Sequence, residues 1–272
     1  MEEVGTLYLV ATPIGNLDDI TFRAIDVLRN VDLIAAEDTR QSLKLLNHYE
    51  ISKPMISYHR HNEDVRSEVL ISKLKQGESI AVITDAGTPG ISDPGEEIVK
   101  EAIKEGIKVV PIPGACAMVN ALICSGLDTK QFTFYGFLPQ NKKLRKEKIE
   151  EIKEEEKTVI IYEAPHRIID TLNEFKKEFG DRNIVLAREL TKIHEEFIRG
   201  TISEVLEKVN PKGEFIIMLE GEKIEKENQL NNLTLEEHYT FYERQGLDKK
   251  EIIKKIAKDR NVNKNEIYQK FI

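Results

Sequence analysis

The chain has 272 residues, of which 40% are hydrophobic and 32% are charged, the composition of a globular protein with enough apolar material for a sizeable core. No apolar run approaches the roughly 20 residues that a membrane-spanning helix needs. The segment 1–5, MEEVG, is acidic overall and lacks the basic and apolar regions of a signal peptide. The formal charge of −8 argues against a polycation that coats nucleic acid, although a local basic patch can still bind RNA.

The cysteines Cys116 and Cys124 lie in one expected helix and form neither a disulfide framework nor a metal-ligand spacing. We therefore expect a cytoplasmic protein with no membrane partner and no bound metal.

Short β-branched runs alternate with segments of helical period from residue 5 to residue 222. In the first half the expected strands are 6–12, 33–36, 55–59, 79–85 and 108–112, with helices such as 22–31, 65–75 and 96–105 between them. This alternation predicts a mostly parallel α/β sheet.

The alternation pauses at residues 111–114, Pro-Ile-Pro-Gly, and a helix of small residues follows over 115–125. A second series of strands then covers 132–137, 158–162, 183–187 and 215–219. We expect two α/β domains, 1–113 and 114–222, with a ligand cleft between them.

Residues 223–272 are expected to form a linker and a small helical module. The polar segment 223–234 is typical of a linker. One helix is expected after Asp248 as N-cap and another near Asn263. The pair could be a helix-turn-helix or a simple packing unit.

The most distinctive segment is 84–95, TDAGTPGISDPG, between an apolar strand and a helix. Its glycines and prolines allow close backbone approach in a fixed loop, and ligands of open α/β sheets bind at the carboxyl ends of strands. Asp85 can accept hydrogen bonds from a ligand there. The alternative is a rigid connector in which Asp93 and Gly95 only cap the next helix.

Two further loops follow strands. The segment 11–17, ATPIGNL, has the position of a nucleotide loop but neither the G-x-G-x-x-G pattern nor a Walker lysine, which disfavours dehydrogenases and NTPases. The segment 111–117, PIPGACA, can aim the N–H groups of a helix start at a ligand, or it can be an interdomain hinge.

In the second half, ionisable residues gather at strand ends: YEAPHR at 162–167, RELTK at 188–192 and Lys212-Gly213-Glu214. This pattern indicates a cleft facing the first domain. His166 alone is weak support, since a histidine after proline at a helix start is more often an exposed or capping residue.

Together these motifs resemble the ribosomal RNA small subunit methyltransferase I family of the tetrapyrrole methylase superfamily. The residues that carry the resemblance are 5–21, 33–40 (LIAAEDTR), 84–95, 111–117, 162–167 and 188–192. The resemblance implies S-adenosylmethionine bound in a bent form between two α/β domains. It places the cofactor against Pro13, Ile14, Asp85, Pro89, Cys116, Ala117, Tyr162 (or Glu163), Ala187 and Gly213.

The resemblance also implies 2′-O-methylation of a cytidine in 16S rRNA of the small ribosomal subunit, by a homodimer. A ribose hydroxyl is poorly acidic, so a base or a cation near the developing alkoxide would help. The candidate catalytic residues are Glu163, His166, Arg188 and Glu189, with Glu37, Asp38 and Arg40 on the facing loop. Ion-paired structural roles for Arg188 and Glu189 remain open.

A basic cluster is the candidate RNA contact: Lys142, Lys143, Arg145, Lys146 and Lys148. Its alternative is a solvated helix face, which the acidic residues after it would also fit. Two other functions stay open: a class III methyltransferase acting on a tetrapyrrole or another small molecule, and a noncatalytic nucleotide- or RNA-binding module.

Overall fold

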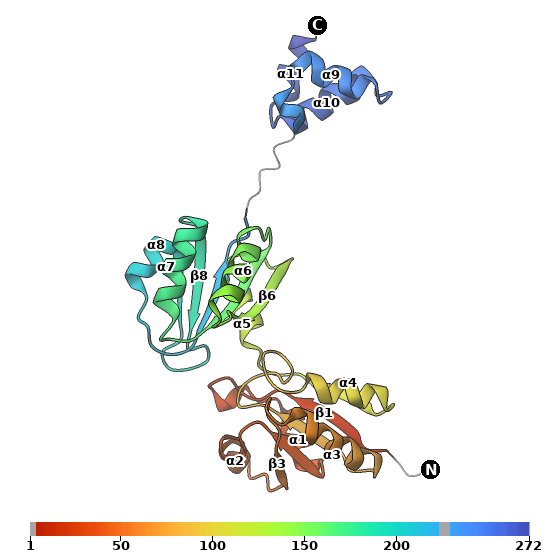
Figure 1. Cartoon of the computed structure of the whole chain (residues 1–272), viewed down its shortest axis with the longest axis vertical. Helices are drawn as coiled ribbons and strands as arrows, with labels where there is room; N and C mark the ends of the chain where they lie inside the picture. Colours follow the sequence, from red (N-terminus) through yellow and green to blue (C-terminus); the bar gives the residue numbers. More distant parts are fainter. Residues whose placement is uncertain (1–3, 223–228, 272) are drawn as a thin grey trace. The chain divides into compact units, whose positions relative to one another are not determined.

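The computed structural model describes residues 4–222 and 229–271, and contacts divide the chain into two compact units, residues 1–222 and 223–272 (Figure 1). The first unit contains two five-stranded sheets, here called the first and second lobes. Within the described residues, no helix combines the length and the apolar character that crossing a membrane requires.

The first lobe is a fully parallel sheet in the order β3-β2-β4-β1-β5. Its strands are β1 (Thr6–Val10), β2 (Leu33–Ala36), β3 (Met55–Ser57), β4 (Ile80–Ile83) and β5 (Lys108–Ile112). Its helices are α1 (Phe22–Asn30), α2 (Thr39–His48), α3 (Glu63–Lys75) and α4 (Glu96–Lys104), and a 3-10 turn, η1, covers Leu17–Asp19.

Helices cover both faces of this sheet. Leu70 and Ile98, from α3 and α4, belong to one apolar cluster, and Leu28 and Leu46, from α1 and α2, belong to the other. Strands buried on both faces are apolar almost throughout, as in the fully buried β2 and β4. The predicted parallel α/β sheet is confirmed here.

The second lobe has the order β6-β7-β10-β8-β9, and only β6 and β7 run parallel. Its strands are β6 (Phe132–Phe137), β7 (Thr158–Glu163), β8 (Asn183–Arg188), β9 (Glu196–Thr201) and β10 (Phe215–Leu219). Residues of α5 (Ala117–Ser125) belong to one apolar cluster. Residues of α6 (Lys142–Lys153), α7 (Ile168–Phe179) and α8 (Ile202–Lys208) belong to another.

The prediction of a mostly parallel sheet is therefore wrong for the second lobe. A parallel connection needs a crossover of a dozen or more residues, usually a helix, but only residues 189–195 join β8 to β9. Strand β9 was not predicted, because its EFIRGT sequence has few apolar residues. The expected domain limits at 113 and 222 stay predictions; β5 ends at Ile112 and α5 begins at Ala117.

The second unit contains α9 (Leu235–Glu243), α10 (Lys249–Asp259) and α11 (Lys264–Lys270) after a 3-10 turn, η2 (Gln229–Asn232). The expected N-cap Asp248 is confirmed, since it forms a capping box with Glu251. The other helix begins near Asn263 as expected, and Asn263 caps it by accepting a hydrogen bond from the backbone of Asn265. Helix α9 was not predicted, although Thr234 and Glu237 form a second capping box. Of the expected linker, residues 223–228 lie outside the described residues.

Candidate functional site

The three Gly/Pro loops of the first lobe form one continuous surface. Thr12 and Gly87 exchange backbone hydrogen bonds of 2.9 and 3.1 Å, which join the loops 11–17 and 84–95. The Thr88 hydroxyl donates to the Ala115 carbonyl at 3.0 Å and brings in the third loop. These segments converge because parallel strands end at one edge of the sheet.

A cleft of about 610 Å³ opens between this surface and the second lobe. From the first lobe it is lined by Ile14, Glu37, Asp85, Ala86, Ser92 and Asp93. From residue 117 onward it is lined by Ala117, Phe137, Tyr162, Glu163, Ala164, Pro165, His166, Ala187, Glu189, Leu190, Glu214, Phe215 and Ile216.

Five of the nine residues predicted to contact the cofactor line this cleft: Ile14, Asp85, Ala117, Tyr162 and Ala187. Pro13, Pro89, Cys116 and Gly213 do not line it. Cys116 is instead the N-cap of α5, just outside the helix in which it was expected.

Tyr162 joins the cleft to the start of α5. Its hydroxyl accepts a hydrogen bond from the Met118 N–H at 3.2 Å, and its ring packs against Phe134 and Phe137. Burial raises the pKa of Tyr162 to about 12, so its hydroxyl stays protonated at neutral pH.

Lys192 lies where the two lobes meet. A Cβ atom at Gly15 would be 2.5 Å from the Lys192 Cγ, so only glycine lets the first loop approach this closely. The Lys192 ammonium donates to Glu189 at 2.9 Å and to Glu214 at 3.0 Å. The backbone N–H of Glu214 and this ammonium lower the pKa of Glu189. Glu189 is thus an ion-paired carboxylate on the cleft wall.

Both carboxylate oxygens of Glu163 accept hydrogen bonds from neighbouring residues. One oxygen accepts from the Arg167 guanidinium at 2.7 Å and from the Ala164 N–H at 2.9 Å, and the other accepts from the Thr171 hydroxyl at 2.7 Å. Its side chain is 0% exposed. This geometry suits a fixed structural anchor at the end of β7 better than a base that must receive a proton.

Arg145 extends this network into α6. Its guanidinium donates to Thr171 at 2.9 Å and to Glu174 at 2.7 Å. Of the predicted RNA contacts, Arg145 is therefore engaged inside the protein, and Lys148 pairs with Glu151 at 2.6 Å. Three cations of the cluster are exposed and form no ion pair with any described residue: Lys142, Lys143 and Lys146.

The remaining catalytic candidates differ in position. Arg188 does not line the cleft; its guanidinium pairs with Glu196 at 3.0 Å and its side chain is 14% exposed. His166 lines the cleft, is exposed, and makes no hydrogen bond to the described residues. Asp38 and Arg40 pair with each other at 3.0 Å at the start of α2.

An acidic wall, defined here as Glu37, Asp85 and Asp93, faces the cleft from the first lobe. The Asp85 carboxylate accepts from the Asp38 N–H at 3.1 Å, and Glu37 accepts from the Asp85 N–H at 3.4 Å. Burial raises the pKa of Glu37, and the charge of Asp85 adds to this effect. Burial and the charges of Glu37 and Asp85 raise the pKa of Asp93 to about 6.

Asp93 was predicted only as a possible helix cap, and it is not one. Gly95 is the N-cap residue of α4, and no side chain caps this helix. The available signal was the position of Asp93 in the loop that follows β4.

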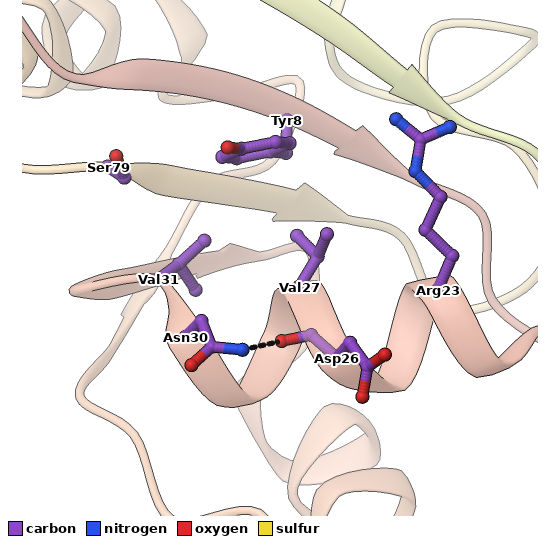
Figure 2. A pocket seen from close by; sticks show the side chains of 7 residues that line it. All are labelled: Tyr8, Arg23, Asp26, Val27, Asn30, Val31 and Ser79. Atoms are coloured by element: carbon purple, nitrogen blue, oxygen red, sulfur yellow. Dashed lines mark hydrogen bonds between the residues drawn. The ribbon is translucent and has the colours of Figure 1, made fainter.

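A smaller hollow of about 290 Å³ lies beside α1 (Figure 2). Its polar lining residues are Tyr8, Arg23, Asp26, Asn30 and Ser79, and the Asn30 amide donates to the Asp26 backbone carbonyl at 2.7 Å. None of the motif loops contributes to it.

Residues 6–206 match the family described as Tetrapyrrole (Corrin/Porphyrin) Methylases. A relative in Halalkalibacterium halodurans named "Ribosomal RNA small subunit methyltransferase I" is 51% identical, over 98% of this chain and 94% of its own. The chain belongs to this methyltransferase family. A relative of the same name in Bacillus subtilis is also 51% identical, over 99% of this chain and 94% of its own.

Solved structures support the fold of the methyltransferase. Diphthine synthase superimposes with a TM-score of 0.63 at 14% identity, over 79% of this chain and 90% of its own. The uroporphyrin-III C-methyl transferase from Thermus thermophilus, in complex with S-adenyl homocysteine, gives 0.56 at 15% identity, over 79% of this chain and 97% of its own. At these identities the likeness concerns the fold alone.

Proposed function

We propose that this methyltransferase transfers a methyl group from S-adenosylmethionine to the 2′-hydroxyl of a cytidine ribose in 16S rRNA of the small ribosomal subunit. The observation that carries the proposal is the two-lobed cleft, built from the motif loops of a chain 51% identical to relatives with an rRNA methyltransferase name. The homodimeric state and the cytoplasmic location belong to the proposal.

The cleft suits S-adenosylmethionine in size and in charge. Its volume of about 610 Å³ lies within the range of small-ligand sites, roughly 300–1,000 Å³. The acidic wall suits a ligand with an ammonium and a sulfonium group, since opposite charges compensate the burial of Glu37 and Asp93. When bound, S-adenosylmethionine supplies an electrophilic methyl group.

The chain's own residues then hold and orient the reactants. Ile14, Ala117 and Ala187 offer small apolar contacts, and Phe137 and Phe215 add aromatic surface. Glu163 and its partners fix the end of β7, so that the turn 164–166 keeps its place in the cleft wall. Alignment of this kind contributes much of the rate when the electrophile is already reactive.

For the RNA, we propose contacts from the exposed cations Lys142, Lys143 and Lys146 of α6. Phosphate contacts of this kind give affinity without reading sequence. Choice of the nucleotide must then come from the cleft, where His166 and Tyr162 lie.

Incubation with labelled S-adenosylmethionine tests the function, with small ribosomal subunits, naked 16S rRNA or a tetrapyrrole as acceptors. We expect label in the rRNA, at an internucleotide bond that resists alkali because its 2′-oxygen is blocked. Label in the tetrapyrrole alone would favour the small-molecule enzyme, and binding without turnover would favour the noncatalytic module.

A matched pair of variants connects this activity to the cleft. Asp85→Asn removes a charge from the acidic wall, whereas Asp26→Asn removes one from the hollow beside α1 (Figure 2). We expect Asp85→Asn to weaken binding of S-adenosylmethionine by about tenfold, the effect of about 1.4 kcal/mol, and Asp26→Asn to leave it unchanged. Equal effects would remove the cleft from the proposal.

A further inference from the structure

Asp93 is chemically different from the other acidic residues of the cleft. Glu163, Glu189 and Glu214 are each held by a cation, and Glu37 and Asp85 accept backbone N–H groups. The Asp93 carboxylate makes no hydrogen bond and no ion pair with any residue of 4–222 or 229–271. It is thus a half-buried carboxylate whose oxygens remain available to a ligand.

The loop holds Asp93 in place from both sides. Before it, Ser92 has a left-handed backbone with φ 64°, and the Arg60 guanidinium donates to the Ser92 carbonyl. After it, the Gly95 N–H donates to Glu63 at 2.9 Å. A non-glycine residue in this conformation costs free energy and persists only where its surroundings impose it, which is common at functional sites.

The second lobe approaches the same loop closely. A Cβ atom at Gly136, in the irregular part of β6, would be 3.2 Å from the Ser92 Oγ. The loop therefore meets both lobes, next to a carboxylate that lines the cleft between them.

We propose that Asp93 is the carboxylate that accepts the proton of the substrate hydroxyl, an inference that rests on the proposed function. The hydroxyl oxygen forms a bond to the methyl carbon, and its proton goes to the Asp93 carboxylate. The electron pair of the broken carbon–sulfur bond stays on sulfur, which becomes a neutral thioether. No oxidant, reductant or further reactant is required.

The charges around Asp93 make it a stronger base than an ordinary aspartate. Burial and the carboxylates Glu37 and Asp85 raise its pKa to about 6, and the Arg60 guanidinium acts in the opposite direction. From the second lobe, Tyr162 faces the same cleft as a neutral phenol, since burial raises its pKa to about 12. In the free protein Asp93 is therefore mostly ionised at neutral pH, the form that accepts a proton.

Asp93→Asn tests the inference, because the amide keeps the shape and removes the base. We expect kcat to fall by about 10²–10³-fold, within the range usual for general bases. The dissociation constants of the rRNA and of S-adenosylhomocysteine, whose sulfur is uncharged, should stay within about twofold of the wild type. Asp93→Glu should restore part of the activity, and His166→Gln should reduce it much less.

The acid limb of the pH–rate profile, where activity falls at low pH, gives a second, independent measurement. For the wild type, kcat/KM reports ionisations of the free enzyme, so it should fall below about pH 6, and the residual activity of Asp93→Asn should lack this limb. NMR of the ligand-free protein, with labelled aspartate carboxyls, should show a group that titrates at the same pH and disappears in Asp93→Asn.

Three results would overturn the proposal: full activity in Asp93→Asn, loss of S-adenosylhomocysteine binding in proportion to activity, or an unchanged acid limb. Failure of the wild type to methylate rRNA would instead remove the proposed function. The two failures are therefore distinguishable in one set of assays.

Discussion

Gly213 offers a sharp test of how the cleft wall is built. Its backbone is left-handed at φ +83°, and a Cβ atom there would be 2.5 Å from the Glu189 Cδ and 2.6 Å from its Oε1. Gly213→Ala should therefore displace the Glu189 carboxylate from Lys192 and from the Glu214 N–H. Gly106→Ala is the matched control, because Gly106 has φ +69° and no atom within 4 Å of the added methyl.

The expected magnitudes follow from these two differences. Both variants force a non-glycine residue into the left-handed region, at a cost of roughly 1–2 kcal/mol. Gly213→Ala should lose about 1–3 kcal/mol more, because a mostly buried carboxylate leaves its hydrogen-bond partners. We therefore expect a loss of about 2–5 kcal/mol for Gly213→Ala against about 1–2 for Gly106→Ala.

Native-state hydrogen exchange of β10 amides measures the stability of the first unit, and calorimetry with S-adenosylhomocysteine measures the cleft. Gly213→Ala should weaken binding by at least about tenfold, and Gly106→Ala should leave it unchanged. Equal losses of stability, together with equal affinities, would refute the assigned role of Gly213.

Three further outcomes are expected. Thr171→Val should destabilise the second lobe by about 1–3 kcal/mol, because it leaves an oxygen of buried Glu163 without its donor. Thr171→Ser keeps the hydroxyl and should cost less. Equal hydrogen-exchange rates of β7 amides in the two variants would contradict this. Replacement of Lys142, Lys143 and Lys146 by Gln should reduce the slope of log affinity for RNA against log salt concentration by about two. Arg145→Gln should mainly lower stability. Unchanged RNA binding of the triple variant at two salt concentrations would exclude these three lysines of α6 as the RNA contact. Burial lowers the pKa of His238, so the unfolded ring takes up a proton at a higher pH than the folded one. The helical module should therefore lose stability as pH falls from about 6.5. Hydrogen exchange of α10, compared with that of α7, would show no pH-dependent difference if this is wrong.

The sequence predicted the elements whose signals are local. Strands over 33–36, 108–112, 132–137 and 215–219 have the predicted limits, the cap Asp248 lies where expected, and the last helix begins near Asn263 as expected. The convergence of three loops was also predictable, because parallel strands place their carboxyl ends at one edge. The antiparallel direction of β9 was not predictable, because it depends on pairing with β8 and not on the periodicity of the sequence.

The hydrogen-bond and ion-pair partners of the site's side chains were the main feature that the sequence did not predict. Glu163 was a candidate base because it ends a strand, but its bond to Thr171 depends on how α7 packs on the second sheet. Arg145 had a local signal that pointed inward: it shares the spacing i, i+4, i+7 with Ile149 and Ile152, both buried. The local sequence around Asp93 does not show that its carboxylate lacks a partner, because this depends on every segment that packs near it in the folded chain.

The acidic wall allows one more conclusion about ligand binding. In the free protein, burial and like charge hold the pKa of Asp93 at about 6 and raise that of Glu37. A cation bound beside them favours the ionised forms and lowers both pKa values, so binding must release protons near pH 6. By the same linkage, affinity for a cationic ligand should fall as pH drops through about 6.

Calorimetry of S-adenosylmethionine in buffers of different ionisation enthalpy counts these protons. At pH 6 Asp93 is about half protonated, so we expect release of up to roughly half a proton from it. At pH 8 Asp93 is already ionised and its release should approach zero. Asp93→Asn should remove most of the signal at pH 6, whereas proton uptake, or no exchange at all, would mean that the cation does not lie against this wall.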